Sequence, residues 1–323
     1  MTRQSMIPVV ARTTAGIAAA RATLRSPVVL VPTMGALHGG HRALLRHGRR
    51  MAGQDGSVVV SVFVNPLQFG AGTDLARYPR TLAGDVSVCA EEGVAVVFAP
   101  LAEQMYPTQQ EITVNPGSAG EMLEGAFRPG FFTGVLTVVL KIFNLVSPEA
   151  AVFGQKDAQQ LFLVRRMVAD LNLKVDIASV ATVREPDGLA ASSRNSYLSP
   201  AERLTALALS KALHAGATAG VRGKEAVLTA ARAELAAAAE ADPPLMTDYL
   251  ELVDPATFAD LDSGYAGPAQ LLVAGTVGKT RLIDNALLTV GGVPFRGDDP
   301  PERPAVPARG DDPAEPPRAG STS

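Results

Sequence analysis

The sequence predicts an α/β protein, in which a Rossmann-like domain with a parallel sheet is followed by a smaller α+β domain. Apolar runs typical of buried strands occur at 28–31, 57–64 and 94–98, and helical patterns separate several of them. Such alternation is typical of βαβ units, in which helices cover both faces of a parallel sheet. After about residue 187 an Ala-rich helical stretch and further strand-like runs indicate a second domain.

Length and composition exclude several classes of protein. The 323 residues are 47% hydrophobic and 19% charged, which is ordinary for a globular protein with room for two cores. The net charge of −3 provides no broad basic surface for nucleic acid. The longest apolar stretch, 135–146, contains Lys141 and Asn144 and is too short to span a bilayer. We interpret the single cysteine, Cys89, as a buried hydrophobic residue, and without a signal peptide we expect a cytoplasmic protein.

The first domain is expected to span 1–187. Besides the strands above, the pattern predicts a helix over 134–145 that is stopped by Pro148. A short strand at 151–153 and a further strand at 174–183 complete the predicted sheet.

The second domain is expected to span 188–295. Its helical stretch, 201–241, is broken by a Gly-rich segment near 215–223. The strand candidates that follow are 248–253, 270–277 and 281–284. The remaining segment, 296–323, contains seven prolines and almost no large apolar residues, so we predict a disordered tail.

The segment 32–41 reads Pro-Thr-Met-Gly-Ala-Leu-His-Gly-Gly-His and directly follows the first predicted strand. It is interpreted as a small-residue turn and a helix start that carries His38 and His41 on one helix face. Backbone N–H groups and the helix dipole favour an anion at that place, and glycines allow close approach. Paired imidazoles there suit a phosphate group. A metal site is disfavoured because the pair encloses no Glu and lacks an apparent third ligand.

Two further polar segments follow predicted strands, and ligands of open α/β sheets bind beyond the carboxyl ends of the strands. Lys156 and Asp157 come after Gly154, where a lysine can neutralise phosphate charge and an aspartate can bind a hydroxyl, bind a metal or cap the next helix. The hydroxyls and guanidinium of 192–194 follow a Pro-Asp-Gly turn and suit a triphosphate. The amides Gln68 and Gln160 suit a small hydroxy acid.

One motif is misleading. The segment 275–280, Gly-Thr-Val-Gly-Lys-Thr, suggests a phosphate-binding P-loop, but the first glycine of that motif would fall at Val273. We predict a hairpin turn there. A Rossmann dehydrogenase is disfavoured as well, because the first strand is not followed by G-x-G-x-x-G.

Together these motifs closely resemble the pantoate–β-alanine ligase (pantothenate synthetase) family of the H-x-G-H nucleotidyltransferase superfamily. The resemblance covers about 28–285 and rests on segments 32–41, 63–69, 78–81, 128–130, 152–161, 184–195 and 248–254. It implies condensation of pantoate with β-alanine to pantothenate through a pantoyl adenylate, with release of AMP and pyrophosphate (EC 6.3.2.1). It also implies a C-terminal lid domain, a homodimer, and magnesium with ATP as co-substrate.

The resemblance also implies roles for individual residues. His41, His38, Lys156 and Arg194 would be catalytic, and Asp85 is the expected metal-side carboxylate. Pantoate would bind Gln68 and Gln160, with Gln68 also near β-alanine. The implied ATP contacts are Met34, Gly35, Ala36, Leu37, His38, Gly39, Gly40, His41, Gly154, Gln155, Lys156, Asp157, Val183, Ala191, Ser192, Ser193 and Arg194.

Four residues depart from the family pattern. Gly39 replaces an acidic residue and Ala191 a methionine, while Phe131 replaces a histidine and Thr133 an arginine. The last two border the expected substrate cavity. Two other functions stay open: an adenylyltransferase acting on a phosphorylated acceptor, which predicts basic residues in the acceptor pocket, and a non-catalytic nucleotide-binding protein.

Overall fold

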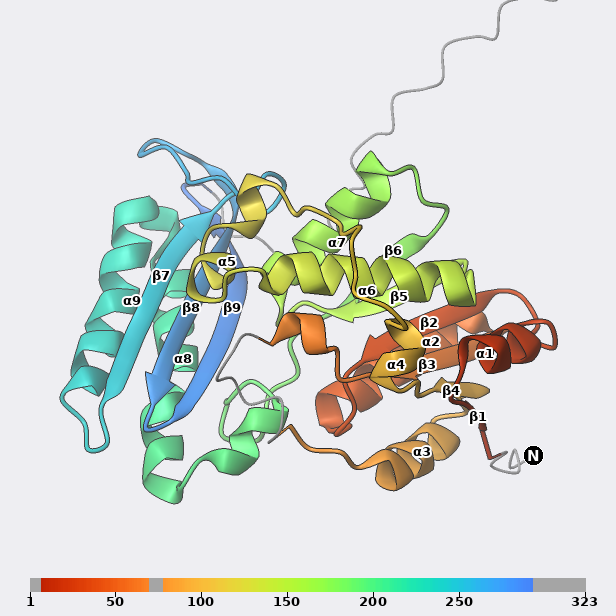
Figure 1. Cartoon of the computed structure of the whole chain (residues 1–323). Coiled ribbons are helices and arrows are strands. Elements are labelled where there is room, and N and C mark those ends of the chain that lie inside the picture. The colour runs from red at the N-terminus through yellow and green to blue at the C-terminus, as the bar shows by residue number, and fades with distance from the viewer. Residues whose placement is uncertain (1–6, 70–77, 293–323) are drawn as a thin grey trace, which may run out of the picture.

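The computed structural model describes residues 7–69 and 78–292, and they form two units that lie side by side (Figure 1). The predicted tail, 296–323, lies outside the described residues. Within the described part of the chain, no helix is long and apolar enough to cross a membrane.

The first unit contains a six-stranded parallel sheet in the described part of the chain, with the strand order β1-β4-β3-β2-β5-β6. Its strands are β1 (Val9–Ala11), β2 (Val28–Thr33), β3 (Ser57–Val62), β4 (Val96–Phe98), β5 (Ala150–Gly154) and β6 (Asp176–Val180). From β2 the chain adds β3 and then β4 on one side of the sheet. It then returns to place β5 and β6 on the other side of β2. The chain therefore has its topological switch point between β2 and β5, where such sheets bind ligands.

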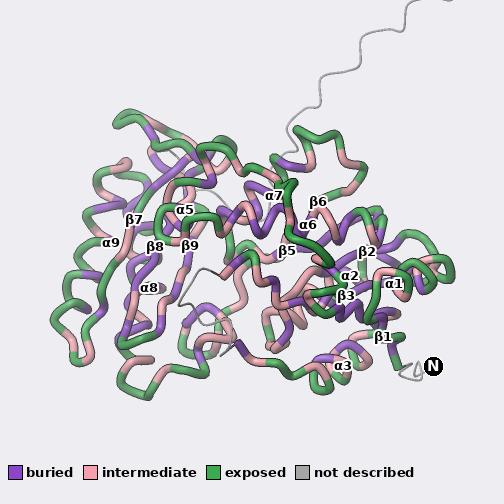
Figure 2. Tube along the Cα trace, viewed as in Figure 1, coloured by how far each residue is buried: buried purple, intermediate pink, exposed green. Residues whose placement is uncertain are grey.

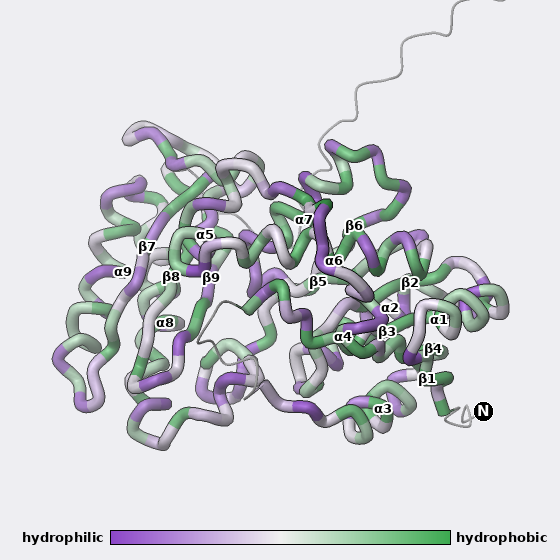
Figure 3. The backbone as a smooth tube through the Cα atoms, viewed as in Figure 1, coloured by the Kyte–Doolittle hydropathy of each residue, from purple (hydrophilic) through white to green (hydrophobic). Residues whose placement is uncertain are grey.

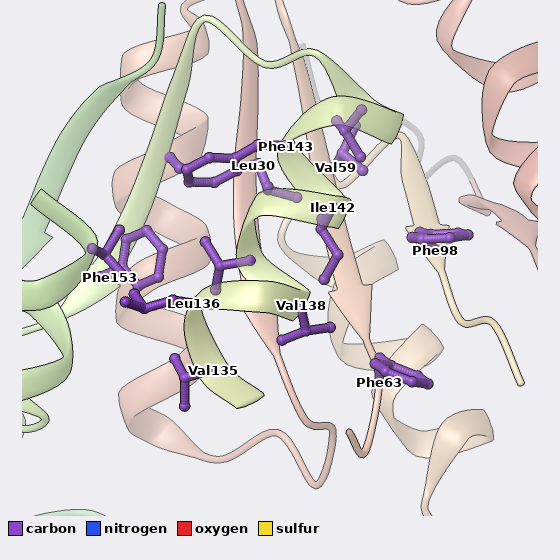
Figure 4. Close-up of a cluster of buried hydrophobic side chains, with 14 of the residues drawn as sticks. Leu30, Val59, Phe63, Phe98, Val135, Leu136, Val138, Ile142, Phe143 and Phe153 are labelled. Atoms are coloured by element: carbon purple, nitrogen blue, oxygen red, sulfur yellow. The ribbon is translucent and has the colours of Figure 1, made fainter. Parts of the chain in front are cut away.

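Helices cover both faces of this sheet. They are α1 (Thr14–Arg21), α2 (Gly39–Ala52), α3 (Leu82–Glu91), α4 (Ala102–Met105), α5 (Glu124–Phe127), α6 (Phe131–Val146) and α7 (Ala158–Asp170), with 3-10 turns η1 (Pro66–Gln68) and η3 (Ser118–Gly120). On one face, apolar side chains of α6 lie against Leu30 and Val59 (Figure 4). On the other face, Leu45 of α2 and Cys89 of α3 pack against Val31. Burial of both faces explains the continuous apolar strands (Figure 2).

The second unit has a three-stranded antiparallel sheet, β7 (Leu245–Val253), β8 (Gly267–Val277) and β9 (Thr280–Val290), in that order. The amphipathic helices α8 (Pro200–Ala219) and α9 (Lys224–Ala239) pack on it (Figure 3), and η4 (Ser193–Tyr197) and η5 (Gly220–Arg222) are short 3-10 turns. Gly278 and Lys279 form the turn between β8 and β9, with Gly278 at a φ of 59°. The predicted hairpin is therefore confirmed.

The predicted elements are found, but helix α1 and strand β1, which precede the first predicted strand, were not predicted. Strand β1 was not predicted, because it is only three residues long and lies at the edge of the sheet, where Val9 and Val10 are exposed. Such a segment lacks the length and the alternating burial that identify a strand from sequence.

The two units are joined by an apolar and an ionic contact. Phe162 of α7 stacks on Phe258, with 5.0 Å between the ring centroids. Arg281 of β9 donates two hydrogen bonds to the carboxylate of Glu124 in α5, at 2.7 and 2.8 Å. Tyr249 donates a third to the same carboxylate at 2.9 Å, and Arg281 also pairs with Asp248 at 2.7 Å. The Glu124 side chain is only 8% exposed, so this ion pair is largely desolvated.

We expect Glu124→Gln to destabilise the protein in a pH-dependent way. Burial alone would raise the pKa of Glu124, but the hydrogen bonds and charge of Arg281 outweigh it, so the pKa lies below its ordinary value of 4.5. The stabilisation is therefore complete above about pH 4.5 and is lost as the pH falls through the folded-state pKa. At pH 7 the variant should melt about 5 °C lower than the wild type, and the gap should close in acid.

Calorimetric scans between pH 3 and 7 measure this difference. Asp170→Asn, which breaks the exposed pair of Arg166 and Asp170, is the matched control and should change the melting temperature little. An equal loss in both variants, or a gap that does not depend on pH, would contradict the assignment.

Candidate active site

A cavity of about 980 Å³ lies between the carboxyl edge of the parallel sheet and the β7–β9 sheet. Both units contribute to its walls. Of the residues expected from sequence to form the site, the cavity brings together Met34, His41, Gln68, Lys156, Asp157, Gln160, Ser192, Ser193 and Arg194. The other expected residues, His38 and Asp85 among them, are not among the residues that line the cavity.

The turn after β2 is held in an unusual backbone conformation. Gly35 and Ala36 both have positive φ, 86° and 52°, so the chain reverses within two residues. The Gly35 N–H donates to the Thr33 hydroxyl at 3.2 Å. The N–H groups of Ala36 and Leu37 donate to the two carboxylate oxygens of Asp85, at 3.2 and 2.8 Å. This carboxylate therefore fixes the turn that leads into the histidine pair.

Asp85 is only 3% exposed, and the Thr81 hydroxyl also donates to its oxygens, at 3.3 Å. With both oxygens used by the protein, the geometry favours a positioning role for Asp85 over the metal-side role expected from sequence. Among the described residues, no group of three or more His, Cys, Asp or Glu side chains is arranged to hold a metal ion.

The two histidines form a reciprocal cap at the start of α2. His38 is the N-cap residue with an extended backbone, rather than a helical residue beside His41 as the sequence suggested. The Gly40 N–H donates to Nδ1 of His38 at 3.1 Å, and the His38 N–H donates to Nδ1 of His41 at 3.2 Å. Because each Nδ1 accepts a hydrogen bond, each neutral ring carries its proton on Nε2. The ring centroids are 4.1 Å apart.

Both imidazoles are held in the neutral form. Burial, the neighbouring His38 and the charge of Lys156 lower the pKa of His41 to about 3. Burial and Lys156 also lower the pKa of His38. Gly40 is needed here, because a Cβ at its position would lie 2.9 Å from the His38 ring. Gly39 has open space around it, so the acidic residue that it replaces is not required for packing.

The second phosphate-binding candidate is the turn 154–157 between β5 and α7. It lies beside the histidine pair because β5 and β2 are parallel neighbours, with Leu30 opposite Ala151. Lys156 and Asp157 line the cavity, and Asp157 occupies the N-cap position of α7 without a capping hydrogen bond from its side chain.

The third candidate, 192–194, follows a closed loop. The Ala191 N–H donates to the Val183 carbonyl at 2.8 Å, and Gly188 has a φ of 95° at the predicted turn. Val183 and Ala191 thus form the base of the loop that presents the two serines and Arg194. The Tyr78 hydroxyl hydrogen-bonds to Ser193 from the opposite side.

The wall of the cavity that carries Gln68 is closely packed. The N-terminal turns of α6 approach η1 so closely that a Cβ on Gly134 would lie 2.3 Å from the Leu67 carbonyl oxygen. Asn65 donates to the Gly134 carbonyl at 3.0 Å. Arg128 donates to the Gln68 carbonyl at 3.1 Å, and its guanidinium lies 3.5 Å from the centroid of the Phe131 ring. Phe131, a departure from the family pattern, therefore orders Arg128.

Several residues at this cavity were not predicted. Glu124, Arg281 and Asn285 line it, and so does Lys279 at the tip of the β8–β9 hairpin. The segment 275–280 was correctly interpreted as a turn, but nothing in its sequence shows that the turn closes over the site. The adjacent polar pair Asp284-Asn285 within the otherwise apolar segment 282–288 was the available signal.

Comparison with known proteins supports the family resemblance over most of the chain. The sequence model of the family described as pantoate-β-alanine ligase matches residues 6–287. A pantothenate synthetase of Thermobifida fusca is 60% identical over 289 residues, which cover 88% of this chain and 96% of that protein.

Solved structures agree with the fold. A pantothenate synthetase of Thermus thermophilus superposes with a TM-score of 0.79 at 45% identity, covering 86% of this chain and 98% of that one. A pantoate-β-alanine ligase of Francisella tularensis, solved with βγ-ATP and β-alanine, gives a TM-score of 0.70 at 30% identity, covering 87% and 97%. The chain belongs to the pantoate-β-alanine ligase family.

Proposed function

We propose that this ligase makes pantothenate in two steps, by forming pantoyl adenylate from ATP and pantoate and then passing the pantoyl group to β-alanine. The observation that carries the proposal is the pair of neutral imidazoles whose Nε2–H groups take no part in the capping bonds, of which His41 lines the cavity together with Lys156, Gln68 and Gln160. The Francisella relative, solved with β-alanine and an ATP ligand, supports the choice of substrates.

In the first step the ionised carboxylate of pantoate attacks the α-phosphorus of ATP. A carboxylic acid is already ionised near neutral pH, so this step needs no general base. The bond to the bridging oxygen breaks, and pyrophosphate leaves with the electron pair. The protein then has to position the groups and stabilise charge on phosphate oxygens, which we assign to Nε2–H of His38 and His41, to Lys156, and to 192–194.

In the second step the deprotonated amine of β-alanine attacks the acyl carbon and expels AMP. Gln68 and Gln160, which reach the cavity from η1 and α7, would orient pantoate through its hydroxyl and carboxylate oxygens. Water would hydrolyse the adenylate, so we propose that the second unit, 188–295, acts as the lid that excludes it.

The residues present fit a magnesium ion that is carried mainly by the nucleotide. Mg²⁺ keeps several waters and substrate phosphates as ligands and needs only one or two protein carboxylates. Asp157, which lines the cavity, would hold the ion on the protein side. When bound, the ion would neutralise phosphate charge. A homodimer and a cytoplasmic location complete the proposal on the resemblance alone.

Isotope exchange between pyrophosphate and ATP tests the two-step route. Exchange should require pantoate and should not require β-alanine, because the first step is reversible on its own. A coupled assay for AMP, with each substrate omitted in turn, complements it. Absence of pantoate-dependent exchange would exclude the adenylate, and a stable adenylated product would indicate an adenylyltransferase instead.

We expect His41→Ala to slow the exchange by a factor of about one hundred or more while the fold is retained, because a donor to the reacting phosphate is lost. His47 lies on the same helix, outside the residues that line the cavity, so His47→Ala is the matched control. The control should retain exchange within about twofold. Full activity in His41→Ala would refute the role of His41.

The substitution Asp85→Asn distinguishes a positioning role of Asp85 from a metal-binding role. An amide can accept from only one of the two N–H groups that the carboxylate now satisfies, so the turn should loosen. We expect the KM for ATP to rise about tenfold. The magnesium concentration that gives half-maximal rate should stay unchanged. Steady-state rates over a magnesium series measure both, and a shift in the magnesium dependence would restore the metal-side role.

A further inference from the structure

A residue of the second unit holds the backbone of the lysine turn. The side-chain amide of Asn285, on β9, donates to the carbonyl of Lys156 at 2.7 Å and to the carbonyl of Gln155 at 3.0 Å. Both carbonyls belong to the turn between β5 and α7. Asn285 is only 6% exposed, so these two bonds are largely shielded from water.

The orientation of that amide is itself fixed. Gln270, on the neighbouring strand β8 and two residues before the position opposite Asn285, donates from Nε2 to Oδ1 of Asn285 at 2.8 Å, which directs the NH₂ group of Asn285 toward the turn. On its other side the turn is tied to the parallel sheet, because the Gln155 N–H donates to the Val180 carbonyl at 2.8 Å. The backbone of Gln155 and Lys156 is therefore held from both units, through the Gln155 N–H on the sheet side and through the two carbonyls on the β9 side.

The neighbouring residue contacts the other phosphate-binding segment. Asp284 accepts two hydrogen bonds from Arg184, at 2.6 and 3.1 Å, and Arg184 also donates to the Gly188 carbonyl at 3.1 Å. Arg184 and Gly188 belong to the loop that presents residues 192–194. Two adjacent residues of β9 thus hold both the turn that carries Lys156 and the loop that carries Arg194.

We propose that Asn285 is a positioning residue for the adenylation step and acts through Lys156. Its two hydrogen bonds fix the peptide groups on both sides of the Lys156 Cα, so the ammonium meets the phosphates only while β9 is docked. Formation of the adenylate thereby depends on the contact between the two units. This inference rests on the two-step function proposed above.

Asn285→Asp tests it, because the substitution keeps the size of the side chain but replaces both donors with acceptors facing two carbonyls. Pantoate-dependent exchange should fall about ten- to a hundredfold. Consumption of synthetic pantoyl adenylate by β-alanine should stay within about threefold of the wild type. In a Lys156→Ala background the same substitution should cost less than about threefold, because its partner in function is already gone.

Lys224→Met is the matched control. Lys224 donates to Asp260 at 2.8 Å and to the Leu261 carbonyl at 2.6 Å. Both bonds lie within the second unit and do not involve the turn between β5 and α7. The effect of Lys224→Met on exchange should be the same with and without Lys156. Equal losses in both half-reactions, or full additivity of Asn285→Asp with Lys156→Ala, would overturn the positioning role. Failure of the wild type to show exchange would instead refute the two-step function.

Discussion

The parallel pairing of β2 with β5 is the constraint on which the rest of the site depends. These strands are separated by more than a hundred residues in the chain, yet Leu30 lies opposite Ala151. Their carboxyl ends therefore deliver the histidine turn and the lysine turn to one point. Because both strands are buried on both faces, their register cannot slip without exposing apolar side chains. The packing of the core therefore fixes the positions of the histidine turn and the lysine turn relative to each other.

Where these two turns meet, hydrogen bonds within the chain use some polar groups and leave others available to a ligand. The Nδ1 atoms of His38 and His41 and the oxygens of Asp85 accept nearby backbone N–H groups. The imidazole Nε2–H groups remain outside this network of caps. Neutral rings suit the task, since they donate hydrogen bonds without the large cost of burying a second charge beside Lys156. Lys156 then supplies the positive charge, and after burial it is a further cause of the lowered pKa of both rings.

The sequence predicted what local patterns encode. Apolar runs located the central strands, and the glycines and histidines of 32–41 located the turn and helix start after β2, whose phosphate-binding role stays a prediction. The sequence did not predict very short elements or contacts between residues that are far apart in the chain. The edge strand β1 is too short for a pattern, and His38 became a cap rather than a helical residue because its backbone is extended. The bonds from Asn285 to a turn 129 and 130 residues away depend on how two units dock, which no local spacing encodes.

The polar contacts of Glu124, Arg281 and Asn285 between the units lie at the cavity itself, and this placement bears on how the proposed lid would work. Moving β9 away from α5 would separate Arg281 from Glu124, whose largely buried carboxylate would need new solvation. The same movement would take Asn285 from the lysine turn and loosen the phosphate site. If the second unit acts as the proposed lid, opening would weaken nucleotide binding as it admits water, whereas closure would assemble the donors as it excludes water. In the proposed mechanism, one set of contacts would then both shield the adenylate and allow it to form.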